Sequence, residues 1–178
     1  MTQPISPTPS VRWIVALLAV AGLVRVALLG AYPLMDTTEA RYGSIALQMA
    51  LTGDWTVPHT SPGVPFLGKP PLSFWLSGLS LRLLGVNAFA ARLPSLALSI
   101  LAVALAMLLG SRLWDRATGL LAGLVLATGG VFYLSAGAVM TDPALTATVA
   151  LTMVSLPLAA TAPPGRGQRL WGHLFFVG

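Results

Sequence analysis

Acidic side chains are scarce in this chain, and their positions give the first indication of chemistry. The 178 residues include only five of them, which are Asp36, Glu39, Asp54, Asp115 and Asp142. A carboxylate beside a substrate can act as a general base toward a hydroxyl or an amine. Asp36 and Glu39 are the catalytic candidates, and Asp142 and Asp54 are further acids expected on the same face of a membrane. Asp115 lies between two arginines and is expected to cap a helix or form an ion pair.

Two of these acidic positions also fit a structural role. Asp36 and Glu39 stand three residues apart before an apolar-striped segment, which is the spacing of a capping box. Asp142 followed by Pro143 is typical of a helix N-cap with proline at the first helical position. Capping also fixes the orientation of a carboxylate, so the structural and the catalytic interpretations both stand.

Cations of the same region are candidates for binding phosphate. Lys69, in the segment 68–71 (GKPP), either lies along an apolar surface with its ammonium in water or binds a phosphate at the membrane surface. Arg41 and Arg92 are the other candidate phosphate ligands. His59 has no second histidine nearby and the chain has no cysteine, so no metal site is predicted.

The composition indicates which solvent surrounds these residues. Apolar residues make up 56% of the chain and charged residues only 8%, whereas a soluble domain carries about 25% charged residues. A bilayer removes the need for a charged surface. The net charge of +5 then indicates cytoplasmic ends or contact with anionic membrane lipids. Nucleic acid is not expected as a partner, because no basic cluster with interleaved aromatics occurs.

The fold class predicted is an all-α polytopic membrane protein with about four spans. About 20 residues at 1.5 Å each cross a core of about 30 Å, and suitable apolar segments are 11–30, 94–110, 117–134 and 143–160. The first is read as a retained anchor, after a disordered stretch at 1–10. Arg25 interrupts it, and such a residue either reaches the interface or binds an anionic group. A fifth apolar segment near the end is too short to span.

The basic residues predict the orientation. The loop at 136–142 has no Lys or Arg, whereas the N-terminal flank and the other short loops are basic, at Arg12, Arg112, Arg116, Arg166 and Arg169. By the positive-inside rule the N-terminus is cytoplasmic. The 31–92 loop and Asp142 then share the outer face. Four cations of that long loop run against the rule, which suggests that they bind a ligand.

Two short helices are expected within the outer loop. The first is 39–51, with an apolar stripe at Tyr42, Ile45, Ala46 and Met49. The second is 71–84, whose length of about 21 Å is too short to span and whose broad apolar face favours the interface. Four prolines make the intervening 54–70 segment an irregular loop.

The motifs of this loop resemble those of a known family. In order they are Glu39-Ala40-Arg41-Tyr42, Gly53-Asp54-Trp55 with Val57-Pro58, Gly68-Lys69-Pro70-Pro71-Leu72 with Trp75, Gly85-Val86-Asn87, and Phe89-Ala90-Ala91-Arg92-Leu93-Pro94-Ser95. They resemble the first outer loop of the bacterial members of the protein O-mannosyltransferase superfamily, which include the aminoarabinose:lipid A transferases. The resemblance covers about residues 11–160.

This resemblance implies a glycosyltransferase of the GT-C architecture in the bacterial inner membrane. Such enzymes move a sugar from a polyprenyl phosphate to a lipid or protein acceptor on the outer face. The family's catalytic acid lies in an Asp-Glu-x-Arg-Tyr pattern, so Asp36 or Glu39 fills that role here. Lys69, with Arg41 or Arg92, would hold the departing phosphate. Similar proteins often have a glutamate immediately before Lys-Pro-Pro, and this chain has Gly68 at that position. The difference weakens the support for a bound divalent metal ion.

Members of the family have more spans and usually a soluble C-terminal domain. Residues 11–178 are therefore expected to be a truncated GT-C-like domain, which would need a separate chain carrying the remainder for activity. The alternative is a small non-catalytic membrane protein or a lipid-binding or transport subunit. A transporter should place ionisable residues within its spans, and only Arg25 comes near.

Overall fold

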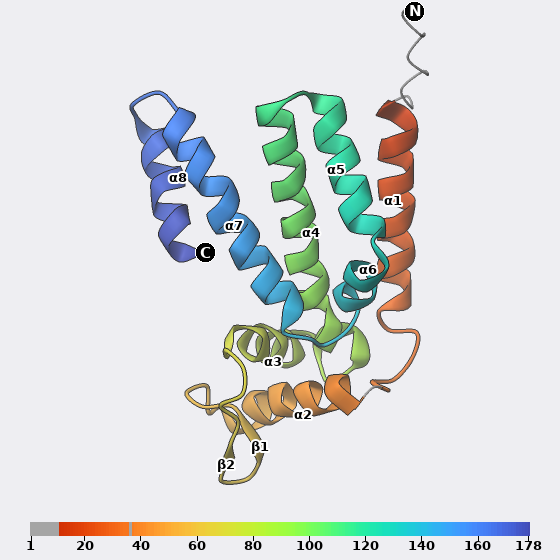
Figure 1. Cartoon of the computed structure of the whole chain (residues 1–178). Coiled ribbons are helices and arrows are strands. Elements are labelled where there is room, and N and C mark those ends of the chain that lie inside the picture. The colour runs from red at the N-terminus through yellow and green to blue at the C-terminus, as the bar shows by residue number, and fades with distance from the viewer. Residues whose placement is uncertain (1–10, 36) are drawn as a thin grey trace, which may run out of the picture.

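The computed structural model describes residues 11–35 and 37–178. The expected disorder of 1–10 lies outside these residues. The described chain is helical apart from one small hairpin, with the elements α1 (Val11–Leu28), α2 (Thr37–Thr52), β1 (His59–Ser61), β2 (Val64–Pro65), α3 (Leu72–Leu84), α4 (Ala88–Leu113), α5 (Arg116–Thr128), α6 (Gly130–Ala136), α7 (Asp142–Thr161) and α8 (Arg166–Val177). In Figure 1, α1, α4, α5 and α7 form one layer, and α2 and α3 lie across its lower end.

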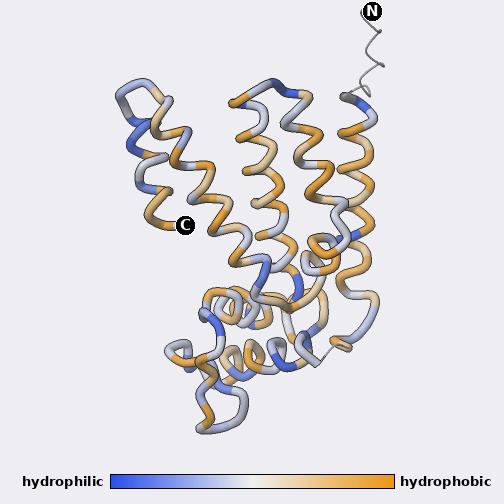
Figure 2. Tube along the Cα trace, in the orientation of Figure 1, coloured by the Kyte–Doolittle hydropathy of each residue, from blue (hydrophilic) through white to orange (hydrophobic). Residues whose placement is uncertain are grey.

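The upper layer is the membrane-spanning part. Within the described residues α4 and α7 are long and apolar enough to cross a bilayer, and α5 with α6 makes a third span if the bent pair is counted as one. α1 is an 18-residue apolar helix that packs against α5. Figure 2 shows hydrophobic residues along these helices and hydrophilic ones at the α4–α5 turn. The predicted polytopic helical fold is confirmed.

The span predicted at 117–134 consists of two helices, α5 and α6, that are bent by 72° relative to each other. The break falls at Gly129, which has an extended backbone and is followed by Gly130. Glycine in a helix interior costs about 1 kcal/mol relative to alanine, so a Gly-Gly pair is a weak point. The bend turns α6 toward the end of α1.

The start of α4 also differs from the prediction. The helix begins at Ala88, and Pro94, expected at the start of the span, lies inside it. Proline has no N–H, so the carbonyl of Ala90 loses its helical partner. The hydroxyl of Ser80 on α3 donates to this carbonyl at 2.6 Å. A contact from the neighbouring helix thus supplies the carbonyl with the donor that the proline removes.

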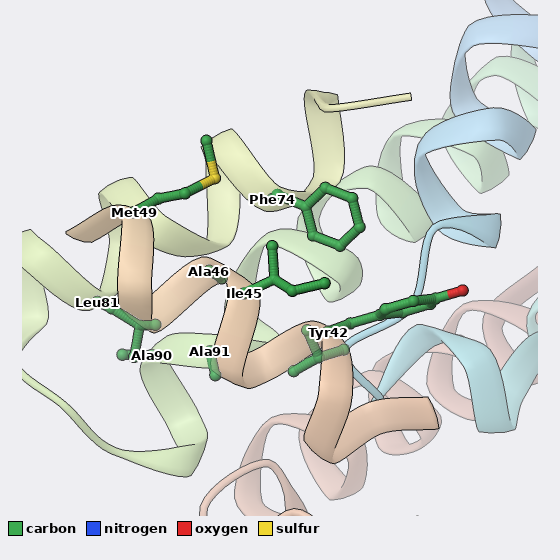
Figure 3. Packing of buried hydrophobic residues seen from close by; sticks show 9 residues of the cluster. Tyr42, Ile45, Ala46, Met49, Phe74, Leu81, Ala90 and Ala91 are labelled. Carbon is green, nitrogen blue, oxygen red and sulfur yellow. The ribbon is translucent and has the colours of Figure 1, made fainter. Parts of the chain in front are cut away.

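The lower layer has its own apolar core. The predicted stripe of Tyr42, Ile45, Ala46 and Met49 is buried against Phe74 and against parts of α3 and α4, as Figure 3 shows. Burial of a large apolar side chain contributes about 1.5–3 kcal/mol. The two predicted outer-loop helices are confirmed as α2 and α3, with ends at most two residues from those expected.

The segment 54–70 contains a short antiparallel hairpin that the sequence did not predict. Ser61 pairs with Val64, and Gly63 has a φ of 80° between them. Trp75 of α3 holds the segment in place, because its indole N–H donates to the carbonyl of Trp55 at 2.7 Å. The start of this segment is therefore tied to α3.

The last apolar segment, predicted to be too short to span, forms the 12-residue helix α8. It folds back along α7 (Figure 1). Trp171 packs there against the buried cluster of Leu105, Val154 and Leu158.

Candidate functional site

Two predicted site residues, Glu39 and Arg92, meet where the layers join. Nε of Arg92 donates to Oε1 of Glu39 at 2.7 Å, and Nη2 donates to Oε2 at 2.9 Å. The side chains are 0% and 6% exposed. A bidentate arginine–carboxylate pair of this kind is among the stronger polar contacts in proteins.

The rest of the Arg92 guanidinium holds the chain after α1. Nη1 donates to the carbonyls of Leu29 and Tyr32 at 2.7 and 2.8 Å, and Nη2 donates to that of Pro33 at 3.0 Å. A guanidinium has five N–H donors, and all of them are used. Arg92 therefore has no donor left for a substrate phosphate, and its contacts are those of a positioning residue.

Glu39 has a third bond, to the turn that precedes α7. The backbone N–H of Val139 donates to its Oε1 at 3.0 Å. The carboxylate thus ties α2 to α4 and to the α6–α7 turn. Asp36, the other motif acid, lies outside the described residues, and so does its part of the predicted capping box.

Lys69 and Asp142 line one pocket of about 220 Å³ between the start of α3 and the start of α7. Both side chains are exposed. They do not pair directly, since the ion pair found among residues 11–35 and 37–178 is that of Glu39 with Arg92. The pocket thus presents an ammonium and a carboxylate that are both open to a ligand.

Ser73 adds a polar group that the sequence analysis missed. It lines the same pocket, and its buried hydroxyl has no hydrogen-bond partner in the described structure. Leu72, the first residue of α3, and Asp142, the first of α7, also line the pocket. The N–H groups at a helix start favour an anion. The arrangement is suited to a phosphate beside a carboxylate.

The predicted N-cap role of Asp142 is wrong by one residue. α7 begins at Asp142 itself, and its N-cap is Thr141, which makes no side-chain capping bond. Thr141 already has helical backbone angles, so the helix starts before the expected position. Asp115 does cap a helix, because it accepts from the N–H of Thr118 at 2.7 Å.

Arg41 and Asp54 lie apart from the Lys69 pocket. Arg41 is exposed, and its guanidinium stands 5.4 Å from the ring centre of Tyr42. Asp54 accepts from the N–H and the hydroxyl of Thr56 at 3.0 and 2.6 Å. These bonds lower the pKa of Asp54 below its usual value. Its contacts are those of a residue that shapes the loop.

No group of three or more His, Cys, Asp or Glu side chains that could hold a metal occurs in the described parts of the chain. The position of the family's glutamate, Gly68, faces the ring of Phe66, which would lie 3.2 Å from a Cβ there.

The sequence profile of the family described as dolichyl-phosphate-mannose-protein mannosyltransferase matches residues 12–178. An undecaprenyl phosphate-alpha-4-amino-4-deoxy-L-arabinose arabinosyl transferase of Pseudomonas fluorescens is 35% identical over 161 residues, which is 89% of this chain and 29% of that protein. The corresponding transferase of Pseudomonas aeruginosa strain UCBPP-PA14 is 35% identical, over 86% of this chain and 28% of its own. The chain spans less than a third of these curated relatives.

Crystal structures give the same picture of the fold. ArnT from Cupriavidus metallidurans in the apo state superposes with a TM-score of 0.82 at 22% identity, over 93% of this chain and 31% of that one. The same protein bound to undecaprenyl phosphate superposes with a TM-score of 0.83, over 94% of this chain and 31% of its own.

Proposed function

Because this chain belongs to the dolichyl-phosphate-mannose-protein mannosyltransferase family, we propose that it forms the N-terminal part of a membrane glycosyltransferase. The donor is a polyprenyl phosphate sugar, and the curated relatives, named for undecaprenyl phosphate aminoarabinose, favour that sugar. The observation that carries the proposal is the pocket in which Lys69, Ser73 and Asp142 come together.

The pocket suits the charge changes of glycosyl transfer. The bond between the anomeric carbon and the phosphate oxygen breaks, and its electron pair leaves with the polyprenyl phosphate. The ammonium of Lys69 and the hydroxyl of Ser73 would stabilise this charge, as would the N–H groups that begin α3 and α7. A polyprenyl tail lies in the bilayer, so its phosphate must be met at the surface, where α2 and α3 cross the bundle (Figure 1).

The incoming hydroxyl or amine must lose a proton to a base as it bonds to the anomeric carbon. Asp142 shares the pocket with Lys69, and we assign it to this site, with Asp36 as the second acid to test. Glu39 is occupied by Arg92 and Val139, so we assign it a positioning role. Arg41 is exposed and does not line this pocket, so its proposed contact is with a part of the donor other than the phosphate held there.

The test uses the full-length protein that carries this sequence, with sugar transfer to a lipid A acceptor and to a peptide acceptor measured separately. Lys69→Ala is expected to lower kcat by about 10²–10³, the range for loss of one group that stabilises transition-state charge. Arg82→Ala is the matched control, since Arg82 is an exposed cation in the last turn of α3. Unchanged rates in both Lys69→Ala and Asp142→Asn would remove the mechanism.

The same proposal places the lower layer on the outer face of the inner membrane. These 178 residues contain no cysteine, so a thiol introduced among them is the one that this part of the protein offers to a maleimide, and the protein without it gives the background labelling. Thr60→Cys in the hairpin is expected to react with an impermeant maleimide in spheroplasts, whereas Pro163→Cys in the α7–α8 turn should not. The opposite labelling pattern would invert the proposed topology.

A further inference from the structure

An apolar groove of about 430 Å³ lies between α1 and α4 and is closed on one side by α5 and α6. Its walls include Val15, Ala19 and Gly22 of α1 and Ile100, Val103 and Met107 of α4. α1 packs chiefly against α5. The groove shares no residue with the Lys69 pocket, which lies between α3 and α7.

One end of this groove is charged. The side chain of Arg25 lines it and is only 7% exposed. Its Nη2 donates to the carbonyl of Leu134 at 2.7 Å, and its guanidinium carbon is 4.7 Å from the ring centre of Tyr133. A Cβ at Gly137 would collide with the guanidinium. Arg25 is therefore held in one orientation by α6 and the residues after it.

Two polar atoms at the groove have no partner. Nε of Arg25 and Oγ of Ser99 are buried without a hydrogen bond in the structure as described, and both residues line the groove. Ser99 is 3% exposed. The buried acid Glu39 is paired with Arg92 and cannot serve Arg25. An unpaired buried charge is costly, so an anionic acceptor is the complementary ligand.

The dimensions of the groove match one lipid leaflet. Arg25 lies three residues before the end of α1, about 4.5 Å from the end that faces α2 and α3. From Arg25 to Val15 the wall runs ten residues, or about 15 Å, which is half of a hydrocarbon core of about 30 Å. An anionic headgroup at Arg25 would thus place its acyl chain along the groove.

We propose that this groove binds one anionic glycerophospholipid of the leaflet next to α2 and α3. Its phosphate accepts from Nε of Arg25, an oxygen of its glycerol ester region accepts from Ser99, and one acyl chain fills the space between α1 and α4. The lipid completes the packing of α1 and takes no part in the transfer reaction.

The test is lipid retention by the full-length protein reconstituted in vesicles of equal phosphatidylglycerol and phosphatidylcholine. After mild detergent extraction, native mass spectrometry counts the lipids that remain bound. We expect one retained phosphatidylglycerol per unaltered protein molecule. In Arg25→Gln, the ratio of retained phosphatidylglycerol to retained phosphatidylcholine should fall about tenfold. Arg82→Gln on α3 is the control cation and should retain the lipid.

Gly22→Leu separates lipid binding from loss of the arginine. A Cβ at Gly22 meets no atom within 4 Å and Gly22 lines the groove, so a leucine side chain there begins in open space and takes up room that the acyl chain needs; leucine is also a better helix former than glycine. This variant should lose the lipid while Arg25 is intact. Equal retention of both phospholipids by the unaltered protein, or unchanged retention in Gly22→Leu, would overturn the proposal. So would displacement of phosphatidylglycerol by added polyprenyl phosphate.

Discussion

Arg92 and Lys69 are cations of the same outer region, but the structure surrounds them in opposite ways. Arg92 is 0% exposed and gives every N–H to a protein acceptor. Lys69 is exposed and lines a pocket with Asp142, which it does not pair with. A charge whose partners are all within the protein holds elements together, whereas an open charge is available to a ligand.

The same contrast recurs with neutral groups on a single helix. Ser80 of α3 donates to the carbonyl of Ala90, and Ser77 donates to that of Ala91 at 3.1 Å. Ser73, near the start of the same helix, is buried without a partner in the described structure. One helix thus supplies fixed contacts at one end and an unused donor at the other. Both contrasts can be tested by substitution.

The largest expected effect is on stability, at the contact between Glu39 and Arg92 where the two layers join. Arg92→Leu leaves the buried Glu39 carboxylate without its partner, and removal of one member of a buried pair costs about 3–5 kcal/mol. We expect this loss in the free energy of unfolding, measured by denaturant titration in detergent. Lys69→Leu is the matched control and should change stability by less than about 0.5 kcal/mol.

A double substitution sharpens this prediction. Glu39→Leu with Arg92→Leu removes both charges, so it should recover part of the stability lost in either single variant. Additive losses in the double-mutant cycle would show that the pair does not couple α2 to α4.

The outcome at these positions shows what a single sequence can predict. The helical fold and the stripe of Tyr42 and Met49 were predicted because periodicity is local. The pairing of Glu39 with Arg92, 53 residues apart, was not, because it depends on how α2 and α4 are placed. The resemblance named both residues but gave them roles toward substrate.

Other differences also depend on information that hydropathy and motifs do not carry. The break at Gly129 was missed because the hydropathy of 117–134 is continuous while the backbone is not. Ser73 was missed because a serine in an apolar helix carries no signal until its neighbours are known. Lys69 and Asp142 share a pocket because the starts of α3 and α7 lie side by side, which no motif encodes.

The next largest effect after that of Arg92→Leu is expected for Ser80, again on stability. Ser80→Ala leaves the Ala90 carbonyl, which Pro94 cannot serve, without a donor. An unsatisfied buried acceptor costs about 1–3 kcal/mol, and we expect that loss in unfolding experiments. Ser44→Ala is the control, because its exposed hydroxyl donates to the carbonyl of Arg41 within its own helix. Equal stability of the two variants would show that α4 tolerates the proline unaided.

Ser73→Ala should lower donor affinity but not stability, the opposite of what is expected for Ser80→Ala. No bond is lost in the unliganded protein, so stability should change by less than about 0.5 kcal/mol. A hydrogen bond to a charged phosphate contributes about 1.5–3 kcal/mol, so the Kd of an undecaprenyl phosphate donor should rise about tenfold or more. Equilibrium binding with Ser80→Ala as comparison measures this. Donor affinity equal to that of the unaltered protein would place the phosphate elsewhere.

The smallest expected effect is the titration of Asp54, an exposed acid whose partners are local. Its pKa is lowered from 3.8, first by the hydroxyl of Thr56 and then by the Thr56 N–H. A carboxyl with a depressed folded-state pKa stabilises the loop above pH 3.8, and this stabilisation is lost as the pH falls through the folded-state value. Thr56→Val removes the hydroxyl and should raise the pKa of Asp54 toward its usual value, measured by carboxyl-carbon NMR. Because Asp54 lies apart from the Lys69 pocket, donor affinity should not change in this variant. A change in donor affinity would extend the ligand-binding region to the hairpin and weaken the division between paired and open charges.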